Sequence, residues 1–208
     1  MTAAQLVVLR HGRTEWNATG RFQGQADIPL DSRGVAQAQR AAEILAELAP
    51  SAIVSSDLSR ARQTAEPLAH LTGLSVRTDV RLREINVGSW EGLRIEEAMA
   101  SIDPSEAARY LAGEDVRRSP TGETVAEVAS RAAEALAEIG AEAESGSTVI
   151  VVMHGLAGKV GVCQLVGIPH DAWRALGSLH NCGWISVERH RSGNYWRIDD
   201  YNVTAPRV

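Results

Sequence analysis

Two apolar runs in this sequence end in the same dipeptide, His-Gly. The first run, residues 6–9, is followed by Arg10-His11-Gly12, and the second, Thr148–Met153, is followed by His154-Gly155. Both runs are short and rich in β-branched residues, which favours buried strands of a parallel sheet. Because open α/β sheets bind ligands beyond the carboxyl ends of their strands, both histidines are expected at the binding edge of one sheet.

Strand and helix patterns alternate along the rest of the chain. Apolar residues recur every three or four positions from Val35 to Leu48, which predicts an amphipathic helix capped near Asp31 or Ser32. A helix over 58–71 contains Pro67, which should kink it or divide it in two. The other expected strands are 52–55, 74–78, 184–187 and 195–198, with a long helix at 123–143 and a hairpin turn at 192–194. This order predicts a three-layer α/β/α sandwich with a mostly parallel six-stranded sheet and one antiparallel edge strand.

Length and composition indicate one domain over residues 1–208, since 44% of the residues are hydrophobic and no long polar tract interrupts them. The net charge of -5 argues against nucleic-acid binding, which needs a basic face. Cys163 and Cys182 form no Cys-x-x-Cys pair, so both are expected to be reduced and buried, as in a cytoplasmic protein. No apolar run suits a signal peptide or a membrane span, so no export and no membrane contact is expected.

Arg10 and His11 together suit a phosphoryl group. A guanidinium can grip two phosphate oxygens, and a neutral imidazole nitrogen can attack phosphorus. On these residues alone, an ordinary salt bridge and a hydrogen-bonded loop histidine explain the tripeptide equally well.

Two further segments carry polar residues in suitable places. Ser56 and Asp57 follow the 52–55 strand and are N-cap candidates for the next helix, which places Arg60 in its first turn. Glu84 then precedes a stretch that glycines punctuate.

These four segments, in this order, resemble the histidine phosphatase superfamily, which has a phosphoglycerate-mutase-like fold. The resemblance implies that His11 is the nucleophile, with Nδ1 held by a backbone carbonyl and Nε2 free to attack. It implies that Arg10, Arg60 and His154 bind the phosphoryl group, with His154 as an imidazolium. It also implies that Glu84 is the general acid, which protonates the leaving alkoxide and then deprotonates the attacking water.

The same resemblance implies that Asn17, Gln23 and Gly24 contact the phosphate. The alternative is that these residues only form an ordinary turn. His154 alone suits a hydrogen-bonded core histidine. A His-Gly that opens a helix, however, also offers backbone N–H groups to an anion.

Other conspicuous residues are expected to be structural. Glu91, Glu96 and Glu97 suit solvated helix charges. The tryptophans are mainly core residues, with only Trp16 and Trp90 near the mouth of the site. The six histidines show no metal-ligand spacing, and arginines stand where other phosphatases use divalent ions, so no metal and no cofactor is expected.

Residues 84–88 favour hydrolysis over transfer of phosphate between positions of a substrate. Cofactor-dependent phosphoglycerate mutases carry Glu-Arg-x-Tyr-Gly there, to hold the substrate carboxylate and second phosphate, whereas this chain has Ile85 and Val87 in place of Arg and Tyr. A short lid-like insertion at 93–121 carries Arg117 and Arg118, which are candidates to bind an anionic substrate. A solvated lid turn is the alternative reading of these two arginines.

Residues 55–58, 82–84 and 196–202 are similar to the glucosyl-3-phosphoglycerate phosphatases of actinobacteria. This similarity suggests a metal-independent phosphomonoesterase for that or another small phosphorylated metabolite. The alternatives are phosphoglycerate mutase, alpha-ribazole phosphatase or, in another class, a non-catalytic module that binds phosphorylated ligands. Such a module has no reason to keep both His11 and Glu84, so catalysis is favoured. The expected carboxyl-terminal hairpin leaves an edge and apolar residues around Trp196, which favours a homodimer.

Overall fold

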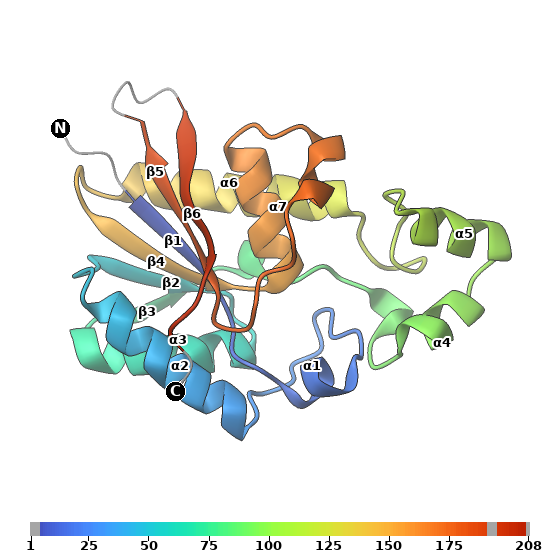
Figure 1. Cartoon of the computed structure of the whole chain (residues 1–208), viewed down its shortest axis with the longest axis horizontal. Coiled ribbons are helices and arrows are strands. Elements are labelled where there is room, and N and C mark those ends of the chain that lie inside the picture. The colour runs from blue at the N-terminus through green and yellow to red at the C-terminus, as the bar shows by residue number, and fades with distance from the viewer. Residues whose placement is uncertain (1–4, 191–194, 207–208) are drawn as a thin grey trace.

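The computed structural model describes residues 5–190 and 195–206, so the hairpin turn expected at 192–194 lies outside the described residues. Within them, one sheet has the strand order β3-β2-β4-β1-β5-β6 (Figure 1). The strands are β1 (Gln5–Arg10), β2 (Ala52–Ser55), β3 (Val76–Thr78), β4 (Thr148–Met153), β5 (Trp184–Arg189) and β6 (Trp196–Val203). The first four pair in parallel, and β5 pairs antiparallel with β1 and with the edge strand β6. The predicted mostly parallel sheet with an antiparallel edge is confirmed.

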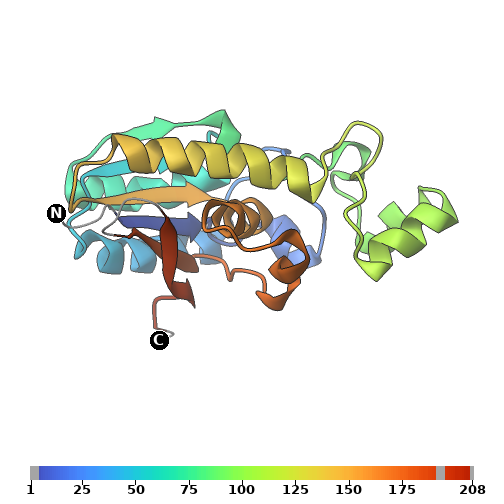
Figure 2. The same cartoon turned by 90° about the horizontal axis from the view of Figure 1, so that it is seen from above.

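Helices cover both faces of the sheet (Figure 2). On one face lie α2 (Ser32–Ala46) and α3 (Ser59–Thr72), and on the other lie α6 (Val125–Glu142) and α7 (Gly155–Leu165). Three short helices, α1 (Glu15–Thr19), α4 (Ile95–Ala100) and α5 (Pro104–Ala112), lie beyond the sheet, and both views show α4 and α5 projecting away from it. Short 3-10 helices occupy Val80–Leu82, Gly88–Trp90 and His170–Ala175. In the described part of the chain, no helix is both long and apolar enough to cross a membrane.

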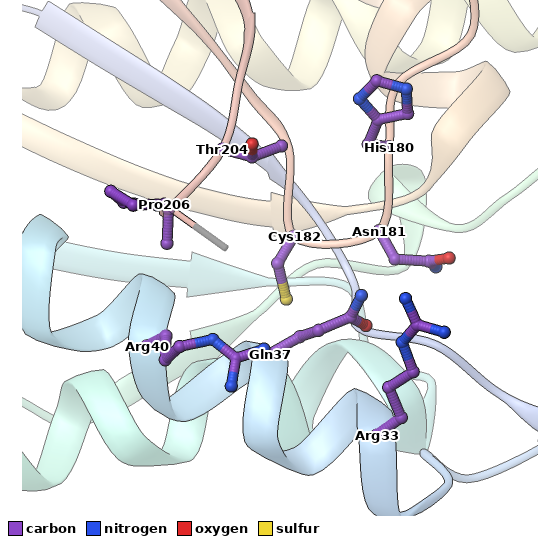
Figure 3. Close-up of a pocket in the computed structure, with 9 residues that line it drawn as sticks. Arg33, Gln37, Arg40, His180, Asn181, Cys182, Thr204 and Pro206 are labelled. Carbon is purple, nitrogen blue, oxygen red and sulfur yellow. The ribbon is translucent and has the colours of Figure 1, made fainter. Parts of the chain in front are cut away.

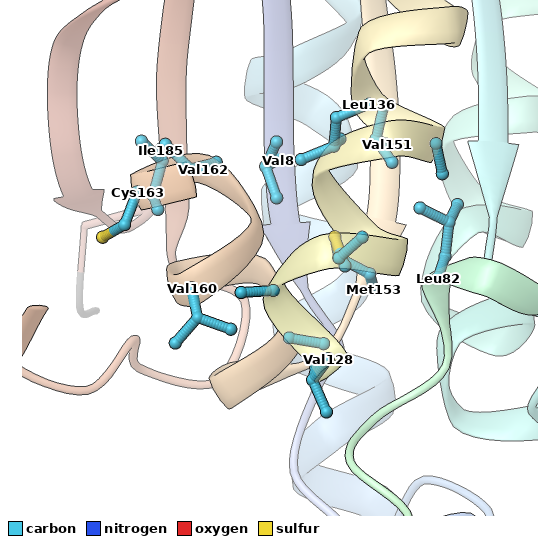
Figure 4. Packing of buried hydrophobic residues seen from close by; sticks show 14 of the residues in the cluster. Val8, Leu82, Val128, Leu136, Val151, Met153, Val160, Val162, Cys163 and Ile185 are labelled. Atoms are coloured by element: carbon cyan, nitrogen blue, oxygen red, sulfur yellow. The ribbon is translucent and has the colours of Figure 1, made fainter. Parts of the chain in front are cut away.

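Strand β1 supplies side chains to both hydrophobic clusters of the molecule. Leu6 and Val8 join the cluster that includes α6 and α7, whereas Val7 and Leu9 join the cluster that includes α2 and α3. This alternation follows from the two-residue period of a strand, and all four side chains are buried. Figure 4 shows the first cluster, where residues of β1, β4, α6 and α7 come together. Burial on both faces explains why the central strands read as continuous apolar runs.

The start of α2 is set by a cap and by a close backbone contact. Asp31 accepts a hydrogen bond from the N–H of Gly34 (2.8 Å), which confirms the predicted cap. A Cβ atom on Gly34 would lie 2.0 Å from the carbonyl oxygen of Arg13, so no other residue allows this approach. The helix therefore packs directly on the loop that follows β1.

The N-cap predicted for α3 is wrong. Leu58 occupies the N-cap position and makes no side-chain cap. Asp57 instead accepts a hydrogen bond from Nε of Arg83 (2.8 Å), and the N–H of Ser59 donates to Asp27 (2.7 Å). Partners distant in sequence thus replace the local cap.

Pro67 is expected from the sequence to kink this helix or to divide it in two, and the structure shows no division. One helix, α3, runs from Ser59 to Thr72 and contains Pro67. Proline removes one backbone donor, but Ala65 and Leu68 beside it are buried in the cluster on this face of the sheet. Packing therefore outweighs the local penalty of the proline.

Candidate active site

The register of the sheet brings the two His-Gly sequences together. β1 and β4 are neighbouring parallel strands in which the last residues, Arg10 and Met153, are partners. His11 and His154 therefore leave the sheet side by side. The N–H of His11 donates to the carbonyl of Met153 (3.0 Å), and the two imidazole centroids lie 5.2 Å apart.

His11 is a buried, neutral imidazole whose Nε2 has no hydrogen-bond partner among the described residues. Its Nδ1 lies 2.7 Å from the carbonyl oxygen of Gly12. A carbonyl only accepts hydrogen bonds, so Nδ1 carries the proton and Nε2 keeps its lone pair. Burial, together with the charges of Arg60 and Arg10, lowers the pKa of His11 well below its ordinary value. The tautomer expected of a nucleophilic histidine is therefore present.

Arg60 reaches the histidine pair from the first turn of α3 and is fully buried. Its guanidinium donates to the carbonyls of Gly24 (2.8 Å) and Ala26 (2.7 Å) and, through Nε, to Nδ1 of His154 (3.2 Å). Burial lowers the pKa of Arg60 to about 10, so the group stays charged at neutral pH. Gly24 has a φ of 52°, and a Cβ there would lie 2.6 Å from Val87, so the loop that holds Arg60 requires glycine.

His154 is neutral, and the imidazolium expected from the sequence is wrong. Because Arg60 donates to Nδ1, that nitrogen carries no proton, and Nε2 lies 2.9 Å from Oγ of Ser56. Burial and the positive charge of Arg60 both lower the pKa of His154 well below its ordinary value. His154 thus contributes an acceptor that orients Arg60 rather than an additional positive charge.

Glu84 occupies the N-terminus of α7. Its Oε1 accepts from the N–H groups of Ile85 and Ala157 (both 2.9 Å), and its Oε2 accepts from the N–H of Leu156 (3.0 Å). The sequence predicts that the backbone N–H groups at this helix start bind an anion, and the group that they hold is the carboxyl group of Glu84. The candidate general acid is therefore fixed in place by α7.

A cleft of about 310 Å³ brings the candidate residues together. Of the residues predicted for the site, those that line it are Arg10, His11, Asn17, Gln23, Gly24, Arg60, Glu84 and Arg118. His154 is not among the lining residues, and it supports the cleft through Arg60. The buried Nε of Arg10 has no acceptor among the described residues, which leaves a cationic donor for an anionic ligand.

The lid places Arg118, but not Arg117, at the cleft. The guanidinium carbon of Arg118 lies 4.6 Å from the ring centroid of Tyr110, and both side chains line the cleft. Arg117 instead donates to the carbonyl of Gly122 (2.6 Å) and to the carboxylate of Glu127 (2.5 Å). The predicted substrate contact of Arg117 is therefore corrected: these bonds hold its side chain at the start of α6, and it does not line the cleft.

Two other residues near the cleft differ from expectation. Trp90 is fully buried and packs against the ring of Tyr110 at a centroid distance of 5.5 Å, so it supports the lid rather than facing the mouth. Glu91 is half-buried and accepts from the N–H of Gln25 (2.9 Å), so it organises a loop rather than lying in solvent.

Asn181 is a supporting residue that sequence reasoning missed. It lies in the loop before β5, and its Nδ2 donates to the carbonyl of His11 (3.2 Å) and to Oδ1 of Asn17 (3.1 Å). A lone asparagine in a loop carries no recognisable signal, because its partners are far away in the chain.

Arg131 of α6 is the second supporting residue that the sequence did not indicate. In the sequence alone it is typical of a solvated charge on a long helix. Its Nη1 donates to the carbonyls of Arg81 and Arg83 (both 2.7 Å), and its Nη2 donates to the carbonyl of Glu84 (2.9 Å). Glu123 accepts from Nε (2.7 Å) and Nη2 (2.8 Å) on the other side. All five guanidinium donors are therefore used, and they fix the backbone that carries Glu84.

We expect Arg131→Met to lower kcat by about 10- to 100-fold, because a loosened backbone misplaces the carboxyl of Glu84. Hydrolysis of p-nitrophenyl phosphate measures the effect, with KM expected to change less than kcat. Arg131→Lys should restore only part of the rate, since an ammonium cannot reproduce the fork. Arg62→Met, at an exposed position of α3, is the matched control. An unchanged kcat in folded Arg131→Met protein would contradict this role.

Comparison with known proteins identifies the family. Residues 6–204 match the family described as the histidine phosphatase superfamily, branch 1. The chain belongs to this superfamily. It is 38% identical over 220 residues to a glucosyl-3-phosphoglycerate phosphatase of Mycobacterium tuberculosis, covering 99% of this chain and 97% of the relative. It is also 37% identical over 188 residues to a probable phosphoglycerate mutase of Escherichia fergusonii, covering 90% of this chain and 86% of the relative.

Solved structures agree with this assignment. The structure of mycobacterial glucosyl-3-phosphoglycerate phosphatase with VO3 matches with a TM-score of 0.86 at 37% identity, covering 96% of this chain and 99% of that chain. A phosphoserine phosphatase of Entamoeba histolytica, in complex with 3-phosphoglyceric acid, matches with a TM-score of 0.82 at 29% identity. The match covers 97% of this chain and 98% of that chain. This membership makes the chain a phosphatase-type hydrolase of phosphomonoesters.

Proposed function

We propose that this enzyme hydrolyses a small phosphomonoester through a phosphohistidine on His11. The observation that carries the proposal is the free Nε2 of a neutral His11 in a cleft that the guanidinium groups of Arg10 and Arg60 also line. A neutral imidazole is nucleophilic, and fixed guanidinium groups stabilise the charge on the transferring phosphoryl oxygens.

Two steps follow from this arrangement. In the first, Nε2 of His11 attacks phosphorus, the bond from phosphorus to the leaving oxygen breaks, and Glu84 gives that oxygen a proton. In the second, water attacks the phosphohistidine, the P–N bond breaks, and Glu84 takes a proton from the water. Glu84 thereby returns to its protonated state and His11 to its neutral state, with phosphate released.

Two side-chain amides complete the proposed phosphate site. Oδ1 of Asn17 accepts from the N–H of Thr14 (3.2 Å) and from Asn181 (3.1 Å), and Oε1 of Gln23 accepts from the hydroxyl of Thr14 (3.0 Å). The NH₂ groups of Asn17 and Gln23 have no acceptor among the described residues, and both residues line the cleft. Both amides are therefore available as donors to phosphate oxygens.

Activity should survive excess EDTA, because arginine side chains supply the positive charge of the site. Among the described residues, no group of three or more His, Cys, Asp or Glu is placed to hold a metal ion. Hydrolysis of p-nitrophenyl phosphate before and after dialysis against EDTA tests this expectation. A loss of activity that one divalent ion restores would show that a bound metal ion supplies part of the positive charge of the site.

We further propose a substrate with a second anionic group, a class that includes glucosyl-3-phosphoglycerate. Arg118 supports this proposal: it lines the cleft, and no carboxylate among the described residues forms an ion pair with it. Burial lowers the pKa of Arg118, so an anionic partner there would offset a desolvated charge. The mycobacterial relative that is named glucosyl-3-phosphoglycerate phosphatase supports the same class of substrate.

Mutase activity is the second candidate, because another relative is named a probable phosphoglycerate mutase. The cleft wall argues against it. Ile85 and Val87 are buried there, at the positions where mutases carry Arg and Tyr. Apolar side chains cannot hold a carboxylate or a second phosphate.

A substrate panel tests both proposals by comparing kcat/KM for glucosyl-3-phosphoglycerate, 3-phosphoglycerate, alpha-ribazole phosphate and p-nitrophenyl phosphate. Arg118→Ala should lower kcat/KM about tenfold or more for the preferred substrate with a second anionic group, and should leave p-nitrophenyl phosphate nearly unaffected. Arg117→Ala is the matched control, since its side chain is bonded away from the cleft. Equal and slow turnover of all esters would indicate a general phosphatase, and rapid interconversion of phosphoglycerates would refute hydrolysis as the main activity.

The homodimer and the cytoplasmic location expected from the sequence remain predictions. Light scattering at micromolar concentration tests the first of them.

A further inference from the structure

A second cavity lies beside the loop that carries Asn181 and Cys182 (Figure 3). It has a volume of about 230 Å³ and lies between α2, the loop before β5 and the segment after β6. Its lining residues are Arg33, Gln37, Arg40, His180, Asn181, Cys182, Thr204, Ala205 and Pro206. None of them lines the catalytic cleft, so this second cavity is a separate feature.

One face of α2 makes the second cavity cationic. Arg33, Gln37 and Arg40 are four and three residues apart, so they share this face, and Figure 3 shows their side chains extending toward the loop of Asn181 and Cys182. Neither arginine forms a hydrogen bond or an ion pair with an acceptor among the described residues, whereas most other arginines there are paired. In a chain of net charge -5, two unpaired guanidinium groups at one cavity form a local site for an anion.

The groups between these arginines do not neutralise them. Burial raises the pKa of the Cys182 thiol to about 12, so the thiol is uncharged. Oε1 of Gln37 is already engaged, because it accepts from the N–H of Arg13 (2.9 Å). Nε2 of Gln37 therefore remains as a further donor beside the arginines.

The second cavity also touches the backbone of the catalytic loop. Asn181 donates to the carbonyl of His11 (3.2 Å), the N–H of Cys182 donates to the carbonyl of Arg10 (3.1 Å), and Gln37 binds the N–H of Arg13. A ligand in this cavity would therefore contact residues that hold the nucleophile loop in place.

We propose that the second cavity binds a small metabolite with two or more acidic groups, phosphate or carboxylate, separately from the substrate. Each guanidinium can form paired, charge-assisted hydrogen bonds with such a group. Arg33 and Arg40 are seven positions apart, which is about 10 Å along the axis of α2. This spacing suits a ligand with an acidic group for each arginine better than it suits a monoanion.

Amide NMR spectra test the proposal at constant ionic strength. Inorganic pyrophosphate and citrate are the probes with two or more acidic groups, and inorganic phosphate and acetate are the probes with one. The amides of Cys182 and Thr204 report on the second cavity, and the amide of Leu156 reports on the catalytic cleft. We expect pyrophosphate or citrate to shift the first two amides saturably, with a Kd of about 1 mM or tighter, and phosphate and acetate to bind there at least about tenfold more weakly. The pyrophosphate and citrate arms distinguish the two ligand chemistries.

The double variant Arg33→Ala/Arg40→Ala should weaken binding at Cys182 and Thr204 by about tenfold or more and leave the phosphate response of Leu156 unchanged. Arg62→Ala, an exposed arginine on α3, is the matched control. Shifts that do not saturate, or that saturate equally in the double variant, would overturn the proposal. Conversion of a dimer to a monomer in the double variant would assign the arginines to a subunit contact and would overturn it as well.

Discussion

Replacing His11 by alanine should lower kcat for p-nitrophenyl phosphate by about 10⁴-fold or more, since removing a catalytic nucleophile commonly costs that much. Among the described residues that line the cleft, His11 is the only histidine, and no serine, threonine, cysteine or aspartate lies with it. His70→Ala, at an exposed position of α3, should leave the rate unchanged. Near wild-type turnover of folded His11→Ala protein would refute the mechanism.

The covalent intermediate should be detectable directly. Rapid quenching after mixing with a radiolabelled phosphomonoester should trap label on Nε2 of His11, in a bond that acid cleaves and alkali does not. Because the pKa of His11 is lowered by burial and by two arginines, the neutral ring persists as pH falls below the ordinary imidazole range. The initial burst of phosphoenzyme should therefore survive mild acidification, whereas label on serine or aspartate would assign a different nucleophile.

The strands and the histidine pair were predictable because their causes are local. An apolar run that must be buried on both faces has few alternatives to a central parallel strand, and the carboxyl ends of such strands share one edge. The runs before His11 and His154 therefore define both the sheet and the position of the site. The register of β1 and β4, which pairs Arg10 with Met153, adds only the detail of how the two rings meet.

The charge states and the supporting residues were not predictable, because their causes are distant in sequence. His154 is neutral because it is buried and because Arg60, which lies 94 positions away, donates to its Nδ1. Asp57 leaves its predicted capping role for Arg83, and Arg131 of α6 binds the loop of Glu84, 47 positions away. Hydrophobic periodicity and capping preferences cannot predict these long-range hydrogen bonds, because both concern residues within about one helical turn of each other.

Arg117 and Arg118 show that the sequence also cannot separate the roles of two neighbouring arginines. Arg117 and Arg118 are indistinguishable by chemistry and by position in the lid. Their roles separate only because Glu127 binds the first, while the ring of Tyr110 directs the second to the cleft.

Arg60→Ala should remove about 2 to 4 kcal/mol of transition-state stabilisation. That range corresponds to a loss of about 30- to 1,000-fold in kcat/KM. The guanidinium is buried and held by the carbonyls of Gly24 and Ala26, so it meets the transferring phosphoryl group without reorganisation. Arg60→Lys should recover only part of the loss, because an ammonium cannot make the same directed bonds. Thermal unfolding of each variant must show a folded protein, since Arg60→Ala leaves buried acceptors unpaired.

The neutral state of His154 allows a further test of the role of Arg60, in a double variant. If His154 acts by orienting Arg60 through Nδ1, the losses caused by His154→Ala and Arg60→Ala should be strongly less than additive in the double variant. If His154 instead carried a charge that bound phosphate independently, the two losses would add. Additive losses, or an Arg60→Ala enzyme within a few-fold of the wild type, would show that the phosphate site is not built around this buried guanidinium.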